Sequence, residues 1–138
     1  MKCVVIDTNI LVSALWSKDG NPALIVQKVL TQELAICYDY RIMSEYTDVL
    51  YRERFAFVPS EIAYILSTIE DNGISVVIDQ DGQDESIIAN GVVWQDEDDR
   101  VFYEVAKYCD AILITGNKHH FPNESFIMTQ VEFLAAYQ

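Results

Sequence analysis

Basic side chains are few in this chain of 138 residues, which has nine lysines and arginines against 22 aspartates and glutamates and a formal net charge of −13. Because nucleic acids are usually bound through lysine and arginine, this balance argues against broad electrostatic attraction to nucleic acid. The acids point instead to a basic partner or to a site that holds cations. Much of the excess lies in one stretch, which contains Asp79, Asp81, Asp84, Glu85, Asp96, Glu97, Asp98 and Asp99. We interpret residues 79–85 as a solvated loop.

Closely spaced cysteines are also absent. The three cysteines, Cys3, Cys37 and Cys109, lie far apart in the sequence, and each is embedded in an apolar segment. Their number is odd and their spacing fits neither a zinc site nor a redox motif. We interpret them as small core residues.

Long hydrophobic runs are missing as well. No apolar run reaches the roughly 18 residues that a membrane span requires, and the first residues lack the apolar region and cleavage site of a signal peptide. We therefore expect a cytoplasmic protein that does not contact membranes. Because 51% of the residues are hydrophobic, residues 1–138 are expected to fold as one compact domain with a substantial core of its own.

The hydrophobic pattern alternates between strands and helices. Strands are predicted at residues 2–6, 34–38, 74–78, 111–115 and 126–128, and helices from residue 10, at 21–30, at 40–51, from 60 to about 72, around 98–109 and at 129–137. Asn21 is suited to an N-cap, Gly73 to a helix stop with positive φ, and Thr129 with Glu132 to a capping box. The alternation predicts an α/β fold, a three-layer α/β/α sandwich with a central, mostly parallel sheet of four to five strands.

Four acids are expected at one edge of this sheet. Asp7 follows the first strand and Glu45 lies early in the helix after the second, at the edge where open α/β sheets bind their ligands. On a helical wheel of about 100° per residue, Glu45 borders the buried face, and Asp98 and Asp99 lie on or beside the core-facing side of the later helix. One of these two could simply be the N-cap of its helix. Their joint position beside Asp7 and Glu45 favours a metal site.

Clustered carboxylates repel one another, and a divalent cation relieves the repulsion. Oxygen ligands with no cysteine or histidine at ligand spacing favour Mg²⁺ or Mn²⁺ over zinc. Such a metal binds phosphate oxygens, lowers the pKa of a water molecule and stabilises a leaving oxygen, so the pattern points to phosphoryl chemistry.

Four segments, in this order, resemble those of the PIN-domain ribonucleases. They are Val4-Val5-Ile6-Asp7-Thr8-Asn9-Ile10-Leu11-Val12-Ser13-Ala14, Ser44-Glu45-Tyr46 with Val49-Leu50, Asp98-Asp99 with Phe102, and Asp110-Ala111-Ile112-Leu113-Ile114-Thr115-Gly116-Asn117. The resemblance spans nearly the whole chain. It implies a metal-dependent endoribonuclease, and many small prokaryotic members are toxins held inactive by an antitoxin protein.

The resemblance assigns Asp7, Glu45 and Asp99 as the acids that hold the metal and position the attacking water. The fourth position of the family is usually aspartate, and here it is Asn117, which can ligate through its carbonyl but brings no charge and leaves a second metal in doubt. Asp98, or less readily Asp96, could supply the missing charge. Asp110 precedes its strand, at the opposite edge of the sheet, so we assign it a structural role.

Other polar residues fit supporting roles. Thr8, Asn9 and Thr115 are suited to orienting the carboxylates by hydrogen bonds, although Asn9 could instead start the first helix. Arg52 and Arg54, with the aromatic Phe55, and Lys118, with His119 and His120, could hold an RNA backbone, although a solvated surface is the plainer interpretation of the arginines. Trp16, Trp94 and Tyr137 could form an interface of a homodimer, with burial in the core as the default.

Other functions remain open. A degenerate PIN fold that binds a metal or a protein without cutting RNA would also fit the acidic composition and Asn117. Phosphatases of the haloacid dehalogenase type need a second aspartate two residues after the nucleophile, where this chain has Asn9. Receiver domains need an aspartate at the end of a central strand and a lysine after a later one, and Asp79 and Lys118 match this poorly.

Overall fold

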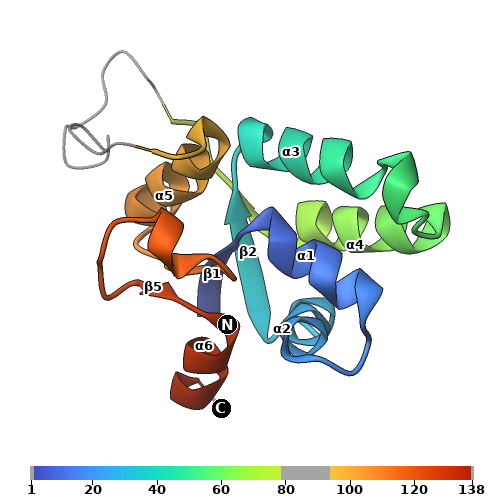
Figure 1. Ribbon diagram of the computed structural model, residues 1–138, viewed down its shortest axis with the longest axis horizontal. Helices are drawn as coiled ribbons and strands as arrows, with labels where there is room; N and C mark the ends of the chain where they lie inside the picture. The colour runs from blue at the N-terminus through green and yellow to red at the C-terminus, as the bar shows by residue number, and fades with distance from the viewer. Residues whose placement is uncertain (1, 79–93, 138) are drawn as a thin grey trace.

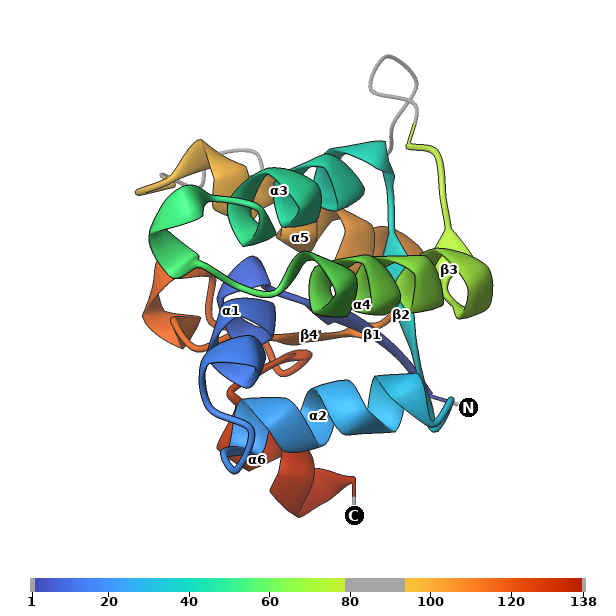
Figure 2. The same cartoon turned by 90° about the vertical axis from the view of Figure 1, so that its right-hand side faces the viewer.

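The central sheet has five strands, all parallel, in the order β3-β2-β1-β4-β5 (Figure 1, with β3 and β4 labelled in Figure 2). They are described by a computed structural model that covers residues 2–78 and 94–137. The strands are β1 (Lys2–Ile6), β2 (Leu34–Tyr38), β3 (Ile74–Ser75), β4 (Ile112–Ile114) and β5 (Ile127–Met128). The predicted α/β class and parallel sheet are confirmed.

Helices cover both faces of this sheet. They are α1 (Thr8–Trp16), α2 (Asn21–Leu30), α3 (Tyr40–Leu50), α4 (Pro59–Asn72), α5 (Glu97–Cys109) and α6 (Gln130–Ala136), with short 3-10 turns at Glu53–Phe55 and Lys118–His120. In Figure 1, α5 lies on one side of β1 and β2, and α1, α2 and α4 lie on the other. Figure 2 looks onto that second layer, with the strands behind it. The three-layer sandwich predicted from the alternating pattern is therefore present.

The core explains why the inner strands are continuously apolar. Val4, Val5 and Ile6 of β1 are fully buried, and every residue of β2 is buried, because helices exclude water from both faces of the sheet. From the helices, α3 adds Ile42, Tyr46 and Leu50, which recur every four residues along one stripe. Apolar burial thus ties α3 to the strands whose ends carry the polar residues.

The strand register brings the polar strand ends together. Ile6 of β1 pairs with Ile114 of β4, and the backbone nitrogen of Asp7 donates to the oxygen of Ile114 at 3.0 Å. Asp7 and Thr115, which follow these strands, are therefore neighbours. Strand β2 runs parallel to β1 and leads through Asp39 into α3. The first turns of α1 and α3 consequently lie at the same edge of the sheet.

Several predicted boundaries differ from the structure. Helix α2 begins at Asn21 with Gly20 at the N-cap, so Asn21 is not the cap. Gly73 does end α4, but its φ of −84° is not positive. Glycine is needed there because a Cβ would meet the backbone oxygens of Ile69 and Ile36, the latter at 2.6 Å. Strand β3 ends at Ser75, three residues before the predicted end. The predicted acidic loop at residues 79–85 lies outside the described residues.

Side-chain burial agrees with most of the remaining expectations. The three cysteines are free, with Cys37 buried and Cys3 and Cys109 partly buried. Trp94 is buried, as the default interpretation held, but Trp16 is 65% exposed. Of the helices that the structure describes, none has the length and apolar character needed to cross a membrane.

Candidate active site

Asp7, which directly follows β1, is almost fully buried, with a relative exposure of only 4%. The hydroxyl of Thr115 donates to its Oδ2 atom at 2.8 Å. Burial raises the pKa of the Asp7 carboxyl, because the charged form loses solvation, and the hydrogen bond from Thr115 offsets part of this rise. A buried carboxylate whose pKa stays raised despite its hydrogen bonds favours the binding of a cation.

Glu45 approaches Asp7 from the second turn of α3. It is half-buried, as the helical wheel predicted, and the hydroxyl of Thr8 donates to its Oε2 atom at 2.7 Å. Burial raises the pKa of Glu45, and repulsion from Asp98 and Asp7 raises it further, while the hydrogen bond from Thr8 lowers it. Thr8 therefore orients Glu45, and Thr115 orients Asp7.

The start of α5 supplies the third acid, Asp99. The N-cap of this helix is Asp96, whose carboxylate accepts from the backbone nitrogen of Asp98 at 3.0 Å. Asp98 and Asp99 are therefore not used as caps. Burial together with repulsion from Asp7 and Asp96 raises the pKa of Asp99 to about 6. The Nδ1 atom of His120 lies 3.7 Å from Asp99 Oδ2 and opposes this rise.

One pocket of about 190 Å³ collects these acids from three elements. Its lining comprises Asp7, Thr8, Asn9, Glu45, Val49, Arg52, Arg54, Phe55, Asp96, Asp98 and Asp99. Within residues 2–78 and 94–137, no three histidine, cysteine or acidic side chains are close enough to form a metal-binding group as they stand. The donors nevertheless fit a hard cation, because they are carboxylates with raised pKa values and hydroxyl-oriented oxygens. Glu45 and Asp99 are partly exposed, which gives their side chains room to turn.

Acidic repulsion in this pocket predicts an unusual pH dependence of stability. A carboxyl whose pKa is about 6 when folded and near 4 when unfolded binds more protons in the folded state between these values, so the free energy of unfolding falls as pH rises from about 4 to about 6. In the wild type, we expect Asp99 to lower the free energy of unfolding by on the order of 2 kcal/mol over this range. Asp99→Asn, which cannot ionise, should not show this decrease. Urea unfolding of both proteins at several pH values measures the difference. Equal pH slopes for the two proteins would contradict the expectation.

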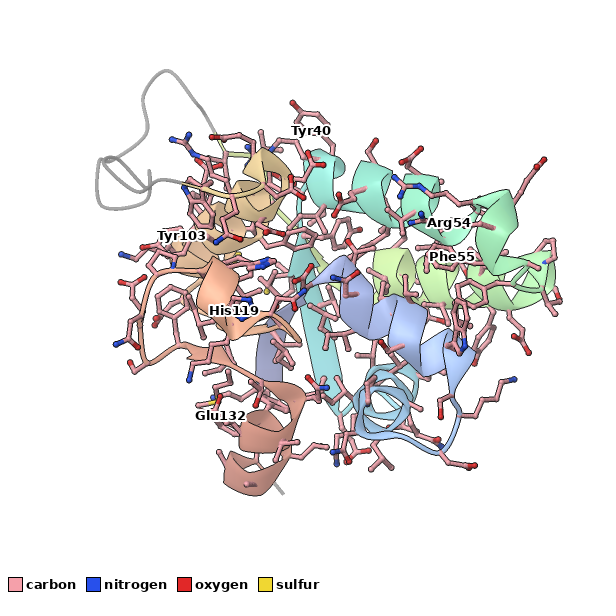
Figure 3. The ribbon with its side chains drawn as sticks, viewed as in Figure 1. Tyr40, Arg54, Phe55, Tyr103, His119 and Glu132 are labelled. Atoms are coloured by element: carbon pink, nitrogen blue, oxygen red, sulfur yellow. The ribbon has the colours of Figure 1, made fainter. Side chains whose placement is uncertain are left out.

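Asn117 is linked to the pocket through Thr115. Its backbone nitrogen donates to the Thr115 hydroxyl at 3.0 Å, and this hydroxyl donates in turn to Asp7. The Asn117 side chain is not part of the pocket lining. Neither is Lys118, whose Nζ lies 3.1 Å from both carboxylate oxygens of Glu132 on α6. Figure 3 shows Glu132 on this helix, apart from Arg54 and Phe55. Glu132 also completes the capping box with Thr129, as predicted.

The remaining sequence candidates have different surroundings. Asn9 lies exposed in the first turn of α1, whose N-cap is Asp7, so it does not start the helix. Arg52 forms an exposed ion pair with Asp48 at 2.9 Å. The Arg54 guanidinium lies 4.9 Å from the centre of the Phe55 ring. Asp110 ends α5 in the left-handed conformation, at the opposite edge of the sheet from Asp7, where its place before β4 predicted it.

Two supports of the site were missed by sequence reasoning. The Tyr46 hydroxyl, fully buried, donates to the backbone oxygen of Ile6, directly before Asp7. Arg41 joins α3 to α5, because its guanidinium contacts Asp39 at 2.8 Å and Glu104 at 3.1 Å. Tyr46 lies in the buried stripe of α3, which gave a signal for its burial but none for its hydrogen bond. No sequence pattern indicates that α3 and α5 lie next to each other, so the contact between Arg41 and Glu104 could not be predicted.

Comparison with known proteins agrees with this architecture. The model of the PIN domain matches residues 3–119 of the chain. The chain is also similar to uncharacterized protein MJ1680 of Methanocaldococcus jannaschii, with 29% identity over 116 residues that cover 83% of this chain and 70% of the relative. No solved structure gives a significant match. Because the matched region includes Asp7, Glu45 and Asp99 and extends over most of the fold, the chain belongs to the PIN-domain family, whose members are generally nucleases.

Proposed function

We propose that this protein is an endoribonuclease that hydrolyses RNA phosphodiester bonds with Mg²⁺ or Mn²⁺. The observation that carries the proposal is the pocket shared by Asp7, Glu45 and Asp99, in which burial raises all three pKa values and repulsion from neighbouring acids raises those of Glu45 and Asp99 further. Three such groups favour a bound divalent cation, since the cation offsets the repulsion that the fold otherwise sustains. Family membership supports nuclease chemistry at this position.

Each residue has a role in this proposal. Asp7, Glu45 and Asp99 hold the metal, and the exposed Asp98 at the pocket rim adds negative charge. Thr8 and Thr115 orient two of these carboxylates through the hydrogen bonds described above, and Asn9 lies at the rim. The bound metal would supply Lewis acidity toward a phosphate oxygen and an activated water. Asn117 contributes through the Thr115 hydroxyl and supplies no charge.

Metal removal tests the proposal. Purified protein should cleave single-stranded RNA in Mn²⁺ or Mg²⁺, lose cleavage in excess chelator and regain it when Mn²⁺ is restored, because the acids alone cannot stabilise the charge that develops on a phosphate. Gel analysis of end-labelled RNA measures the rate, and internal products distinguish an endonuclease from an exonuclease. Cleavage that persists unchanged in chelator would contradict the proposal.

We further propose that the nuclease acts in the cytoplasm as the toxin of a toxin-antitoxin pair, and that it can form homodimers. Support for the toxin role comes from the family alone. Expression of the wild type should then arrest growth of the host, and Asp7→Asn should not. Growth that is equally unaffected by both proteins, at equal amounts of folded protein and with cleavage active in vitro, would argue against a toxin.

A second candidate is a PIN fold that binds a metal or a protein without cutting RNA. Asn117 favours it, because the position that usually carries a fourth acid in the family is neutral here. Calorimetry with Mn²⁺ and a cleavage assay on the same preparation separate the two candidates. Binding of Mn²⁺ without cleavage of any of several RNAs would favour this second function.

A further inference from the structure

Trp16 at the end of α1 and two phenylalanines that follow α3 form a partly exposed aromatic cluster. Phe55 and Phe57 stack with their ring centres 5.2 Å apart and 6° between their planes. Trp16, the last residue of α1, lies nearly perpendicular to both, at 5.8 Å and 6.0 Å. Because these two distances are nearly equal, the indole lies beside the stacked pair and not on top of it. We call Trp16, Phe55 and Phe57 the aromatic platform.

The platform leaves much of Trp16 uncovered. This side chain is 65% exposed, although exposing an indole to water forgoes a large gain from burial. Phe55 and Phe57 are only partly buried. The two phenylalanines contact the indole edge-to-face, and most of its surface remains accessible to a planar group.

The aromatic platform is continuous with the acidic pocket. Phe55 belongs to both, because it lines the pocket together with Arg52 and Arg54. Figure 3 shows Arg54 and Phe55 together on the segment that follows α3. From the other side, α1 begins in the pocket with Thr8 and ends at Trp16, a rise of roughly 12 Å at 1.5 Å per residue. A ligand that extends from the pocket along α1 therefore reaches Trp16.

The charge around the pocket indicates which kind of ligand the platform can bind. The acids of the pocket and the net charge of −13 repel a phosphate backbone. Duplex binding draws mainly on phosphate contacts from many cations, and this rim offers two arginines, of which Arg52 is already paired with Asp48. The Arg54 side chain has no carboxylate partner within salt-bridge distance among the described residues. Unpaired bases, in contrast, gain affinity by stacking on aromatic rings, which needs no positive charge.

We propose that the aromatic platform is a stacking site for unpaired bases, and that it selects single-stranded RNA over duplex RNA for the acidic pocket. Trp16 stacks on a base of the strand, and Arg54 contacts a phosphate between this base and the pocket. The identification of the ligand as RNA rests on the proposed nuclease function. A protein partner is disfavoured as the occupant, because the platform shares Phe55 with the pocket where a phosphate must enter, and two arginines line that pocket beside Phe55.

The two tryptophans make the proposal directly measurable. Trp94 is buried, so Trp94→Phe leaves an emission that reports on Trp16 alone. Titration in chelator, where no metal-dependent cleavage occurs, uses an oligouridylate of about 12 nucleotides and a duplex RNA of matched length. We expect the single strand to quench Trp16 saturably and the duplex to quench it far less. In wild-type protein, Trp16→Ala should weaken binding of labelled oligouridylate roughly tenfold, and Trp16→Phe should restore most of the affinity.

Tyr64→Ala is the matched control. Tyr64 is 60% exposed on α4 and lines a different pocket, so the loss of this exposed ring should leave the affinity for oligouridylate unchanged. Equal affinity of Trp16→Ala and wild type for the single strand would overturn the proposal, and so would equal quenching by duplex. A change in oligomeric state on Trp16→Ala, with RNA affinity unchanged, would overturn it in favour of a protein interface.

Failure of this inference can be told apart from failure of the nuclease assignment. Binding is measured without metal, so stacking on Trp16 can be found even if no RNA is ever cut. Conversely, metal-dependent cleavage could be identical in wild type and Trp16→Ala, for single strands and duplexes alike. This result would support the nuclease function and contradict the base-stacking role of the aromatic platform.

Discussion

Asp7→Asn should lower Mn²⁺-dependent RNA cleavage by roughly a thousandfold, which corresponds to about 4 kcal/mol of lost transition-state stabilisation. The substitution removes one negative charge from the most buried ligand and keeps nearly the same shape. Asparagine can still accept the hydrogen bond from Thr115, so the surrounding geometry should persist. Initial rates of cleavage at saturating Mn²⁺, together with calorimetric titration of Mn²⁺, measure the loss.

Stability should change in the opposite direction, which separates lost chemistry from lost folding. Burial raises the pKa of Asp7, so its ionised form opposes folding at every pH above the folded pKa. A neutral asparagine removes this opposition. At neutral pH without metal, Asp7→Asn should therefore be as stable as the wild type or more stable, whereas added Mn²⁺ should stabilise the wild type alone.

Asp110→Asn is the matched control. Asp110 lies at the opposite edge of the sheet in a left-handed conformation that asparagine also tolerates. Its substitution should leave the rate and the Mn²⁺ affinity unchanged. If Asp7→Asn cleaved RNA as fast as an active wild type in the same metal, Asp7 would not be a ligand and the proposed centre would be wrong.

The position of Asp7 could be predicted because it depends on one strand and one general rule. A short apolar strand ends before it, and the carboxyl edge of a parallel sheet gathers ligands. The position of Glu45 could be predicted equally well, since α3 has a single buried stripe and the helical wheel places Glu45 at the border of this stripe. Both inferences need only local periodicity, which the order of residues carries directly.

The start of α5 shows where local periodicity becomes insufficient. Sequence reasoning left open whether Asp98 or Asp99 was the cap, and the structure gives this role to Asp96. A shift of two residues at the start of a helix changes which side chain caps the helix and which ones can line the pocket. Several neighbouring aspartates satisfy the same capping preference, so the sequence does not identify the cap. Asp99 is partly buried as expected, whereas Asp98 is exposed at the rim.

Glu104 could not be predicted at all. On the wheel it lies about 200° from Phe102, the side that an amphipathic helix turns to water. It is nevertheless only 3% exposed, and its carboxylate pairs with the guanidinium of Arg41 on α3. Such burial depends on how two helices distant in sequence pack together, and amphipathic periodicity carries no information on that packing. The same holds for Trp16 and Phe55, whose contact joins segments that share no sequence signal.

Arg41→Met should lower the free energy of unfolding by about 3 kcal/mol or more. Its partners Asp39 and Glu104 are 1% and 3% exposed, so removing the guanidinium leaves two carboxylates buried without a cation. Arg52→Met is the matched control, because Arg52 forms an exposed pair one turn apart with Asp48, and this change should cost less than about 0.5 kcal/mol. Urea unfolding of the two variants measures the contrast.

A double-mutant cycle identifies the source of this loss. If the loss arises from the uncompensated charge of Glu104, adding Glu104→Gln to Arg41→Met should recover part of it, so the two changes should be strongly non-additive. Additive losses, or equal small losses for Arg41→Met and Arg52→Met, would show that the ion pair does not contribute as described.

Arg41 should also matter for the metal, although it does not line the pocket. It lies one helical turn before Glu45 on α3, and its partner Glu104 lies five residues after Asp99 on α5. The ion pair therefore sets the spacing between two proposed ligands. We expect Arg41→Met to weaken Mn²⁺ binding roughly tenfold, as is typical when a group that positions ligands is lost. Arg41→Lys should fall between, because lysine keeps the charge but lacks the planar fork that reaches Asp39 and Glu104 together. Mn²⁺ affinity that stays at the wild-type value in folded Arg41→Met would mean that α3 and α5 hold their ligands without this contact.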